Sequence, residues 1–151
     1  MKPLLILLGV FGCTLVYMKV VQPVIDLPLA GRIALSIMLL FTASGHFFFT
    51  GGMAKMIPDY VPSRKSLIII SGVAEVLAAI ALFFPAWAAI TGWLLIFFFV
   101  VSLPANIYAS LHRINYQTGK ADGPGLSYLW FRVPFQILLI LWTYFAAISP
   151  F

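Results

Sequence analysis

Five long apolar runs, separated by short turn-rich segments, occupy most of this chain and restrict what it can fold into. Each run has about the 20 residues that an α-helix needs to cross a bilayer, or more. In lipid, only helices and closed barrels satisfy their own backbone hydrogen bonds. The sequence therefore predicts an all-α transmembrane protein, a single membrane domain over residues 1–151. The predicted spans are residues 3–21, 30–53, 66–84, 87–111 and 128–148.

The charge content agrees with a membrane protein and excludes some partners. Only 9% of the residues are charged, whereas an ordinary soluble domain has about 25%. The net charge of +5 comes from basic residues in loops and at span ends, not from one basic stripe. This distribution indicates the lipid bilayer as a partner and no nucleic acid.

Alternate sides of the membrane receive very different numbers of basic residues. Under the positive-inside rule this asymmetry puts the N-terminus in the cytoplasm and the C-terminus outside, in the inner (plasma) membrane. The basic start of the first run resembles a signal peptide, but the run is long and lacks a small-residue cleavage pattern, so we expect a retained helix. One side receives Lys2, Lys55, Arg64, Lys65, Arg113, Lys120 and Arg132, and the other receives Lys19 and Arg32.

A single carboxylate, Glu75, lies in the apolar run SLIIISGVAEVLAAIALFFP. Intramembrane ionisable residues cost a few kcal/mol or more, and they face a partner or a water-filled cavity. His46 and Glu75 both lie roughly 14 Å from the cytoplasmic side at 1.5 Å rise per residue, so they could face each other at one level. We interpret Glu75 and His46 as the candidate catalytic pair, which would exchange a proton. The alternative is that Glu75 only fixes helix register, either protonated or paired with His46 or Arg132.

Each of the last four spans carries polar residues at helical spacing on one face. Lipid offers these residues no hydrogen bonds, so the four stripes should turn towards one another. This predicts a four-helix membrane bundle with a polar interior plus one additional N-terminal transmembrane helix outside it. The candidate ligand-binding residues on these stripes are Thr42, Ser71, Asn106, Arg132 and Gln136. Asn106 and Gln136 can equally be interhelical hydrogen-bonding residues without a ligand.

Metal and thiol chemistry find little support in the sequence. A zinc site needs three or four protein ligands within reach, and we expect no metal site. A bis-histidine haem would need His46 and His112, whose depths differ by about 14 Å. Cys13 is the only cysteine, so no intrachain disulfide or CxxC pair can form.

Several segments resemble the DoxX-like family of small bacterial integral membrane proteins. They are GRIALSIMLLFTASGHFFFTGGMAKMIPDYVP, SGVAEVLAAIALFFP, PANIYAS and FRVPFQILLILW, within roughly residues 31–147. The motif positions are Gly52, Lys55, Glu75, Arg132, Pro134 and Gln136. The resemblance implies a four-helix bundle, and either a subunit of a thiosulfate:quinone oxidoreductase or a partner in membrane assemblies that handle oxidants.

Three functions follow as hypotheses. The first is a redox-associated subunit that binds a quinone-like or other lipophilic ligand in a polar intramembrane pocket. The second is a non-catalytic accessory or chaperone-like membrane protein, and the third is a small proton-coupled transporter, which the lack of an inverted repeat disfavours. No cofactor is certain, and quinone is the one candidate. Another membrane or redox protein, or a second copy in a homo-oligomer, is left open as a partner.

Overall fold

The computed structural model describes residues 2–21 and 24–149, and this part of the chain is all-helical. Four segments are long and apolar enough to cross a membrane: α1, α2, α5 and residues 125–148. The helices are α1 (Lys2–Val21), α2 (Leu27–Phe48), α3 (Thr50–Ala54), α4 (Arg64–Ala81), α5 (Pro85–Leu111), η1 (Gly125–Tyr128), α6 (Leu129–Thr143) and η2 (Tyr144–Ile148).

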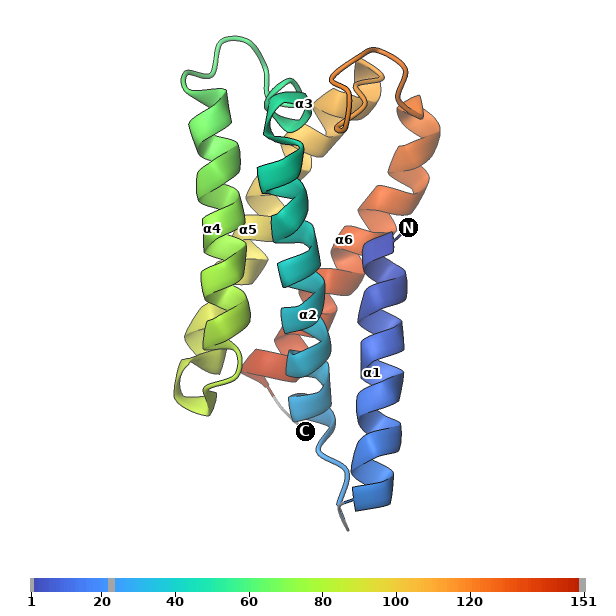
Figure 1. The fold of residues 1–151 in the computed structure, drawn as a ribbon, viewed down its shortest axis with the longest axis vertical. Coiled ribbons are helices and arrows are strands. Elements are labelled where there is room, and N and C mark those ends of the chain that lie inside the picture. The colour runs from blue at the N-terminus through green and yellow to red at the C-terminus, as the bar shows by residue number, and fades with distance from the viewer. Residues whose placement is uncertain (1, 22–23, 150–151) are drawn as a thin grey trace.

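The structure differs from the predicted spans at the second and third runs. The second run divides at Phe49, whose φ of −115° and ψ of 27° end α2 before the short α3 begins. The third helix, α4, starts at Arg64 and has 18 residues, of which Arg64, Lys65 and Glu75 are charged. This charge content separates α4 from the four apolar segments, although it runs lengthwise along α2 (Figure 1).

Helix α2 is the central element of the structure. It packs against α4 on one side and α1 on the other, and it also contacts α6 and η2. Figure 1 shows α2 and α4 as antiparallel neighbours, with α5 and α6 behind them. The buried core consists largely of apolar side chains from α2, α5 and α6, and includes Leu35, Leu39, Leu95 and Leu139.

Local sequence signals explain where the helices begin. Asp26 caps α2, because its Oδ1 accepts a hydrogen bond of 2.8 Å from the backbone N–H of Leu29. Pro28 then lies in the first turn, where a missing N–H costs nothing. Pro85 has the same role at the start of α5, directly after the tight turn that ends α4.

Small residues let the helices approach closely at the end of the molecule where α2 begins. A Cβ atom on Gly31 would lie 2.9 Å from the Cβ of Ala146, and one on Gly92 would lie 2.8 Å from Ile148. The carbonyl oxygen of Gly31 also accepts a hydrogen bond of 3.1 Å from the Trp142 indole. These contacts join α2 and α5 to η2 and the C-terminal part of α6.

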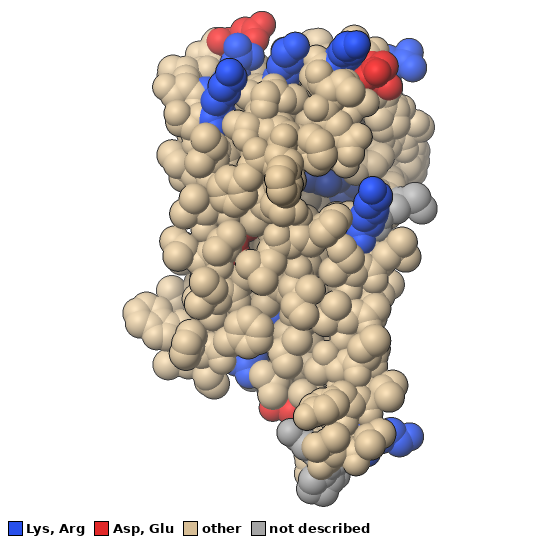
Figure 2. Space-filling view, in the orientation of Figure 1, with Lys and Arg blue, Asp and Glu red and all other residues tan. Residues whose placement is uncertain are grey.

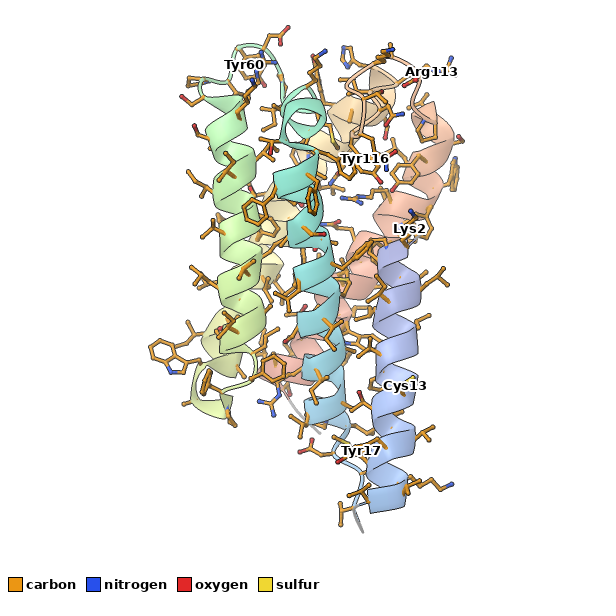
Figure 3. The ribbon with its side chains drawn as sticks, viewed as in Figure 1. Lys2, Cys13, Tyr17, Tyr60, Arg113 and Tyr116 are labelled. Carbon is orange, nitrogen blue, oxygen red and sulfur yellow. The ribbon has the colours of Figure 1, made fainter. Side chains whose placement is uncertain are left out.

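The opposite end is covered by the loop of residues 112–124, which packs on α3. A Cβ on Gly52 would clash with the backbone of Tyr116, and the Phe49 and Tyr116 rings meet edge to face at 5.8 Å. Figure 3 shows Tyr116 beneath Arg113 at this end. The loop therefore closes the end of the molecule nearest the C-terminus of α2.

Helix α1 is displaced along the molecule relative to the other long helices. Its N-terminal end, at Lys2, lies well below Arg113 and Tyr116 in Figure 3, and its other end extends past the start of α2 (Figure 1). Leu4 accordingly lies beside Phe131 and Phe135 of α6. Figure 2 shows most basic side chains gathered at the end formed by α3 and the loops, with acidic side chains among them.

Candidate functional site

Three polar side chains meet between α2 and α4, and we call Thr42, His46 and Glu75 the α2–α4 polar cluster. The Thr42 hydroxyl donates a hydrogen bond of 2.9 Å to Glu75 Oε2. His46 Nε2 lies 3.6 Å from Glu75 Oε1, and the side chains of His46 and Glu75 are only 17% and 7% exposed. Two polar residues one turn apart on α2 therefore face the carboxyl group of α4.

The second ring nitrogen of His46 fixes its tautomer. Nδ1 lies 3.2 Å from the carbonyl oxygen of Ile68, which can only accept, so Nδ1 carries a hydrogen. In the neutral imidazole Nε2 is then an acceptor, and a hydrogen bond to Glu75 requires a protonated carboxyl group. In the charged imidazolium Nε2 donates to a carboxylate. The two residues can therefore share one proton in either direction once Nε2 and Oε1 approach from 3.6 Å to hydrogen-bond distance.

Gly72 makes this close approach of α2 and α4 possible. A Cβ at this position would lie 2.9 Å from His46 Cβ and 3.1 Å from Phe47 Cζ. The buried residues of α4 are Ile68, Gly72, Glu75 and Ala79, which follow one face of the helix. The Glu75 carboxyl group thus lies on the face of α4 that packs most closely on α2.

Arg132 contributes a positive charge near the cluster but forms no hydrogen bond with its residues. Its guanidinium acts electrostatically on both His46 and Glu75. Its Nε is buried and has no hydrogen-bond partner among the described residues. The cluster is therefore under the electrostatic influence of a cation whose Nε donor has no partner among the described residues.

The four acidic residues of the chain do not pair with Arg132. Asp26 caps α2, Asp59 pairs with Arg64, and Asp122 accepts a hydrogen bond of 3.3 Å from Thr118. Glu75 is engaged by Thr42 and His46. Across residues 2–21 and 24–149, no group of three or more His, Cys, Asp or Glu is placed to hold a metal ion.

The other candidate ligand-binding residues lie apart from this cluster. Ser71 is half-buried, and its hydroxyl donates to the carbonyl oxygen of Leu67 in its own helix at 2.8 Å. Ser102, Asn106 and Gln136 form a second group, the α5–α6 polar cluster. The Gln136 amide donates to the Phe99 carbonyl oxygen and to Ser102 Oγ, and Asn106 donates to the Ser102 carbonyl oxygen at 2.9 Å.

The predicted polar stripes thus divide into two interhelical groups, with Arg132 acting on the first. Sequence reasoning missed the role of Gly72 and of the Ile68 carbonyl. The role of Gly72 could have been found from the sequence, because a glycine three residues before Glu75 lies on the same face of the helix and allows a close approach there. The role of the Ile68 carbonyl group could not have been found, because every residue has a backbone carbonyl and nothing in the sequence marks this one.

Comparison with known families gives one match. Residues 35–147 match the model of a family described as a domain of unknown function, DUF8561. The chain belongs to this family. The matched region runs from α2 to η2 and contains both polar clusters and Arg132, whereas α1 lies before it. No curated protein and no solved structure matches the chain.

This match corrects the family expected from the sequence. Membership of the DoxX-like family is wrong, because the family model that fits three quarters of the chain is that of DUF8561. The resemblance depended on glycines, prolines and single polar residues placed within apolar helices. Close helix packing and helix kinks demand such residues in any small helical membrane protein, so they do not identify a family.

Proposed function

We propose that this DUF8561 protein is a multi-pass protein of the inner (plasma) membrane. In this proposal α2, α4, α5 and α6 form a four-helix bundle with a polar interior, and α1 lies outside it as an additional span. The four long apolar segments support insertion into a membrane. The contacts of α4 along α2 and the polar groups between helices support the bundle.

The orientation has the N-terminus in the cytoplasm and the C-terminus outside. Lys55, Lys65, Arg113 and Lys120 all belong to the loop end or the helix end beside it, which supports this orientation by the positive-inside rule. We expect a cytoplasmic-activity reporter to be active when fused before Lys2 and inactive after Phe151. A reporter that is active at Phe151 would contradict both the orientation and the five-span count.

We further propose that the α2–α4 polar cluster binds a proton and exchanges it with a bound lipophilic ligand, of which a quinone is one example. The observation that carries this proposal is the contact of Glu75 with both Thr42 and His46 inside the protein. General acid–base catalysis needs titratable groups within hydrogen-bonding reach or joined through one water. The 3.6 Å between His46 Nε2 and Glu75 Oε1 is slightly longer than a direct hydrogen bond. An ionisable residue in a membrane span is also a functional candidate by default.

The second candidate function is a non-catalytic accessory protein in which the cluster only fastens α2 to α4. The same contacts support it, because they join the C-terminal part of α2 to α4. Purification from the native membrane, with identification of the lipids, quinones and proteins that remain bound, separates the two candidates. A bound small molecule favours the first, and a stoichiometric partner protein without one favours the second.

We expect Glu75→Gln to abolish proton exchange while leaving the fold intact, because glutamine keeps the shape and the Thr42 bond but cannot titrate. Infrared difference spectra between acid and alkaline pH measure this directly. The wild type should show a carboxylic-acid C=O band from Glu75 that Glu75→Gln lacks. Ser71→Ala is the matched control on α4, since the Ser71 hydroxyl bonds only within its own helix.

Two outcomes would count against proton exchange by the Glu75–His46 pair. If Glu75→Gln gives the same difference spectrum as the wild type, Glu75 does not exchange a proton with water. If the variant fails to accumulate in the membrane while Ser71→Ala accumulates normally, the Glu75 carboxylate is required for folding. This result would favour the accessory-protein function, in which the cluster only holds α2 against α4.

A further inference from the structure

The aromatic ring of Phe47 lies on the seam between α2 and α4, beside the α2–α4 polar cluster. A Cβ atom on Gly72 would lie 3.1 Å from Phe47 Cζ and 3.4 Å from Phe47 Cε1, so the end of the ring rests on the backbone of α4 at this glycine. The Cβ atom of His46 approaches the same point to 2.9 Å. Phe47 therefore covers α4 three residues before Glu75, next to the imidazole that faces the Glu75 carboxyl group.

The Phe47 ring lies on the outer side of this seam, which faces the bilayer in the proposed arrangement. Phe47 is 45% exposed, and Leu40, seven residues earlier on the same face of α2, is 44% exposed. At about 3.6 residues per turn, Gly31 lies on nearly the opposite face of α2, where it packs against Ala146 of η2. A molecule that approaches the cluster from the lipid side of α2 therefore meets the Phe47 ring first.

The backbone of Phe47 is held in place, whereas its side chain is free to turn. The Thr50 hydroxyl donates hydrogen bonds to the carbonyl oxygens of His46 and Phe47, at 2.6 Å and 3.0 Å, and these bonds close the last turn of α2. The ring rests on a residue that has no side chain, so dispersion contacts hold it there and no polar bond has to break when it leaves. Rotation of the Phe47 side chain would thus uncover the seam without moving either helix.

We propose that Phe47 is a gate through which the lipophilic ligand enters the α2–α4 polar cluster laterally from the bilayer. The ring rests on Gly72 in the closed state and turns towards the lipid in the open state. This inference rests on the proton-exchanging function proposed above and adds the route by which the ligand of that function arrives. Gly72 then has two roles, because it lets α2 and α4 approach closely and also receives the Phe47 ring.

Carbodiimides, which react with protonated carboxyl groups, measure how often the gate is open. Dicyclohexylcarbodiimide dissolves in the bilayer, whereas a carbodiimide with a quaternary ammonium group stays in water and serves as the comparison. With the protein in lipid nanodiscs, mass spectrometry of peptides gives the rate at which each reagent labels Glu75. Glu75→Gln has no carboxyl group at this position and gives the background.

We expect dicyclohexylcarbodiimide to label Phe47→Ala about tenfold faster than the wild type, because an open state that is a minor population in the wild type becomes permanent in the variant. Phe47→Trp, which has a larger ring, should be labelled more slowly than the wild type. The matched control is Phe48→Ala, because Phe48 is the next residue of α2 and is 81% exposed, and it should keep the wild-type rate. The water-soluble carbodiimide should not distinguish these proteins.

The gate is overturned if Phe47→Ala is labelled at the wild-type rate or is not labelled at Glu75. Equal acceleration with both carbodiimides, or the same acceleration in Phe48→Ala, would show general loosening of the helices and would also overturn it. If Phe47→Ala does not accumulate in the membrane, Phe47→Leu takes its place and should give a smaller acceleration with the lipid-soluble reagent alone.

The infrared band of Glu75 separates this inference from the function on which it rests. A band that is present in the wild type, together with labelling that does not depend on Phe47, would remove the gate and leave proton exchange standing. An absent band in the wild type would remove proton exchange, whatever the labelling of the Phe47 variants.

Discussion

Gly72→Val should lower the melting temperature of the purified protein sharply and reduce its accumulation in the membrane. A Cβ at residue 72 would already lie 2.9 Å from the Cβ of His46, which cannot move without the backbone of α2. Valine adds two further methyl groups to this contact, so α2 and α4 must separate. Overpacking of this kind costs about 1–3 kcal/mol, and we expect the upper end of that range. Separation of the helices should also break the contacts of Glu75 with Thr42 and His46.

Gly12→Val in α1 is the matched control. A Cβ at residue 12 would meet no atom within 4 Å, so the same substitution has open space around it. Its melting temperature should remain near that of the wild type, and Gly72→Ala should lie between the two valine variants. Equal stability of Gly72→Val and Gly12→Val would show that α2 and α4 do not pack at this distance.

Replacing the Glu75–His46 pair by two leucines should retain or raise stability while it removes proton exchange entirely. Buried ion pairs replaced by apolar residues of similar volume are often neutral or stabilising by about 1–4 kcal/mol. His46→Leu alone should be the least stable of the set, because it leaves Glu75 with only the Thr42 hydrogen bond. Its stability loss should grow as pH rises over the range in which the wild-type pair still holds a proton, because Thr42 and Arg132 are then the only groups left to stabilise the ionised Glu75 of the variant.

Melting temperatures of the wild type, the two single leucine variants and the double variant form a mutant cycle that measures this coupling. The interaction between the two positions should be most favourable at the pH where the pair holds one proton, and it should weaken at alkaline pH, where Nε2 and the carboxylate are both acceptors. A double variant that fails to accumulate would show that the pair is needed to hold the helices together. The proton-exchanging interpretation of the cluster would then be lost, and the accessory-protein interpretation would stand.

Helix positions followed from the sequence because they depend on local properties. Hydropathy over about 20 residues places the apolar segments, and Asp26, Pro28 and Pro85 mark helix starts through backbone hydrogen bonding. Glu75 was found in the same way, as the one carboxylate in an apolar run. The break at Phe49 was missed because the second predicted span was extended to residue 53 across Thr50, Gly51 and Gly52.

The partners of each polar residue depended on the rotation and offset of whole helices, which only the tertiary structure decided. Ser71 and Glu75 are one turn apart, yet the seam with α2 passes through Gly72 and leaves the Ser71 hydroxyl bonded within α4. Gln136 bonds to α5 rather than to the α2–α4 polar cluster. Apolar length and local start signals such as Asp26 and Pro85 therefore determined that the long helices form and where they begin, because both act within one segment. Close packing at single glycines determined which side chains meet, because it depends on two segments at once.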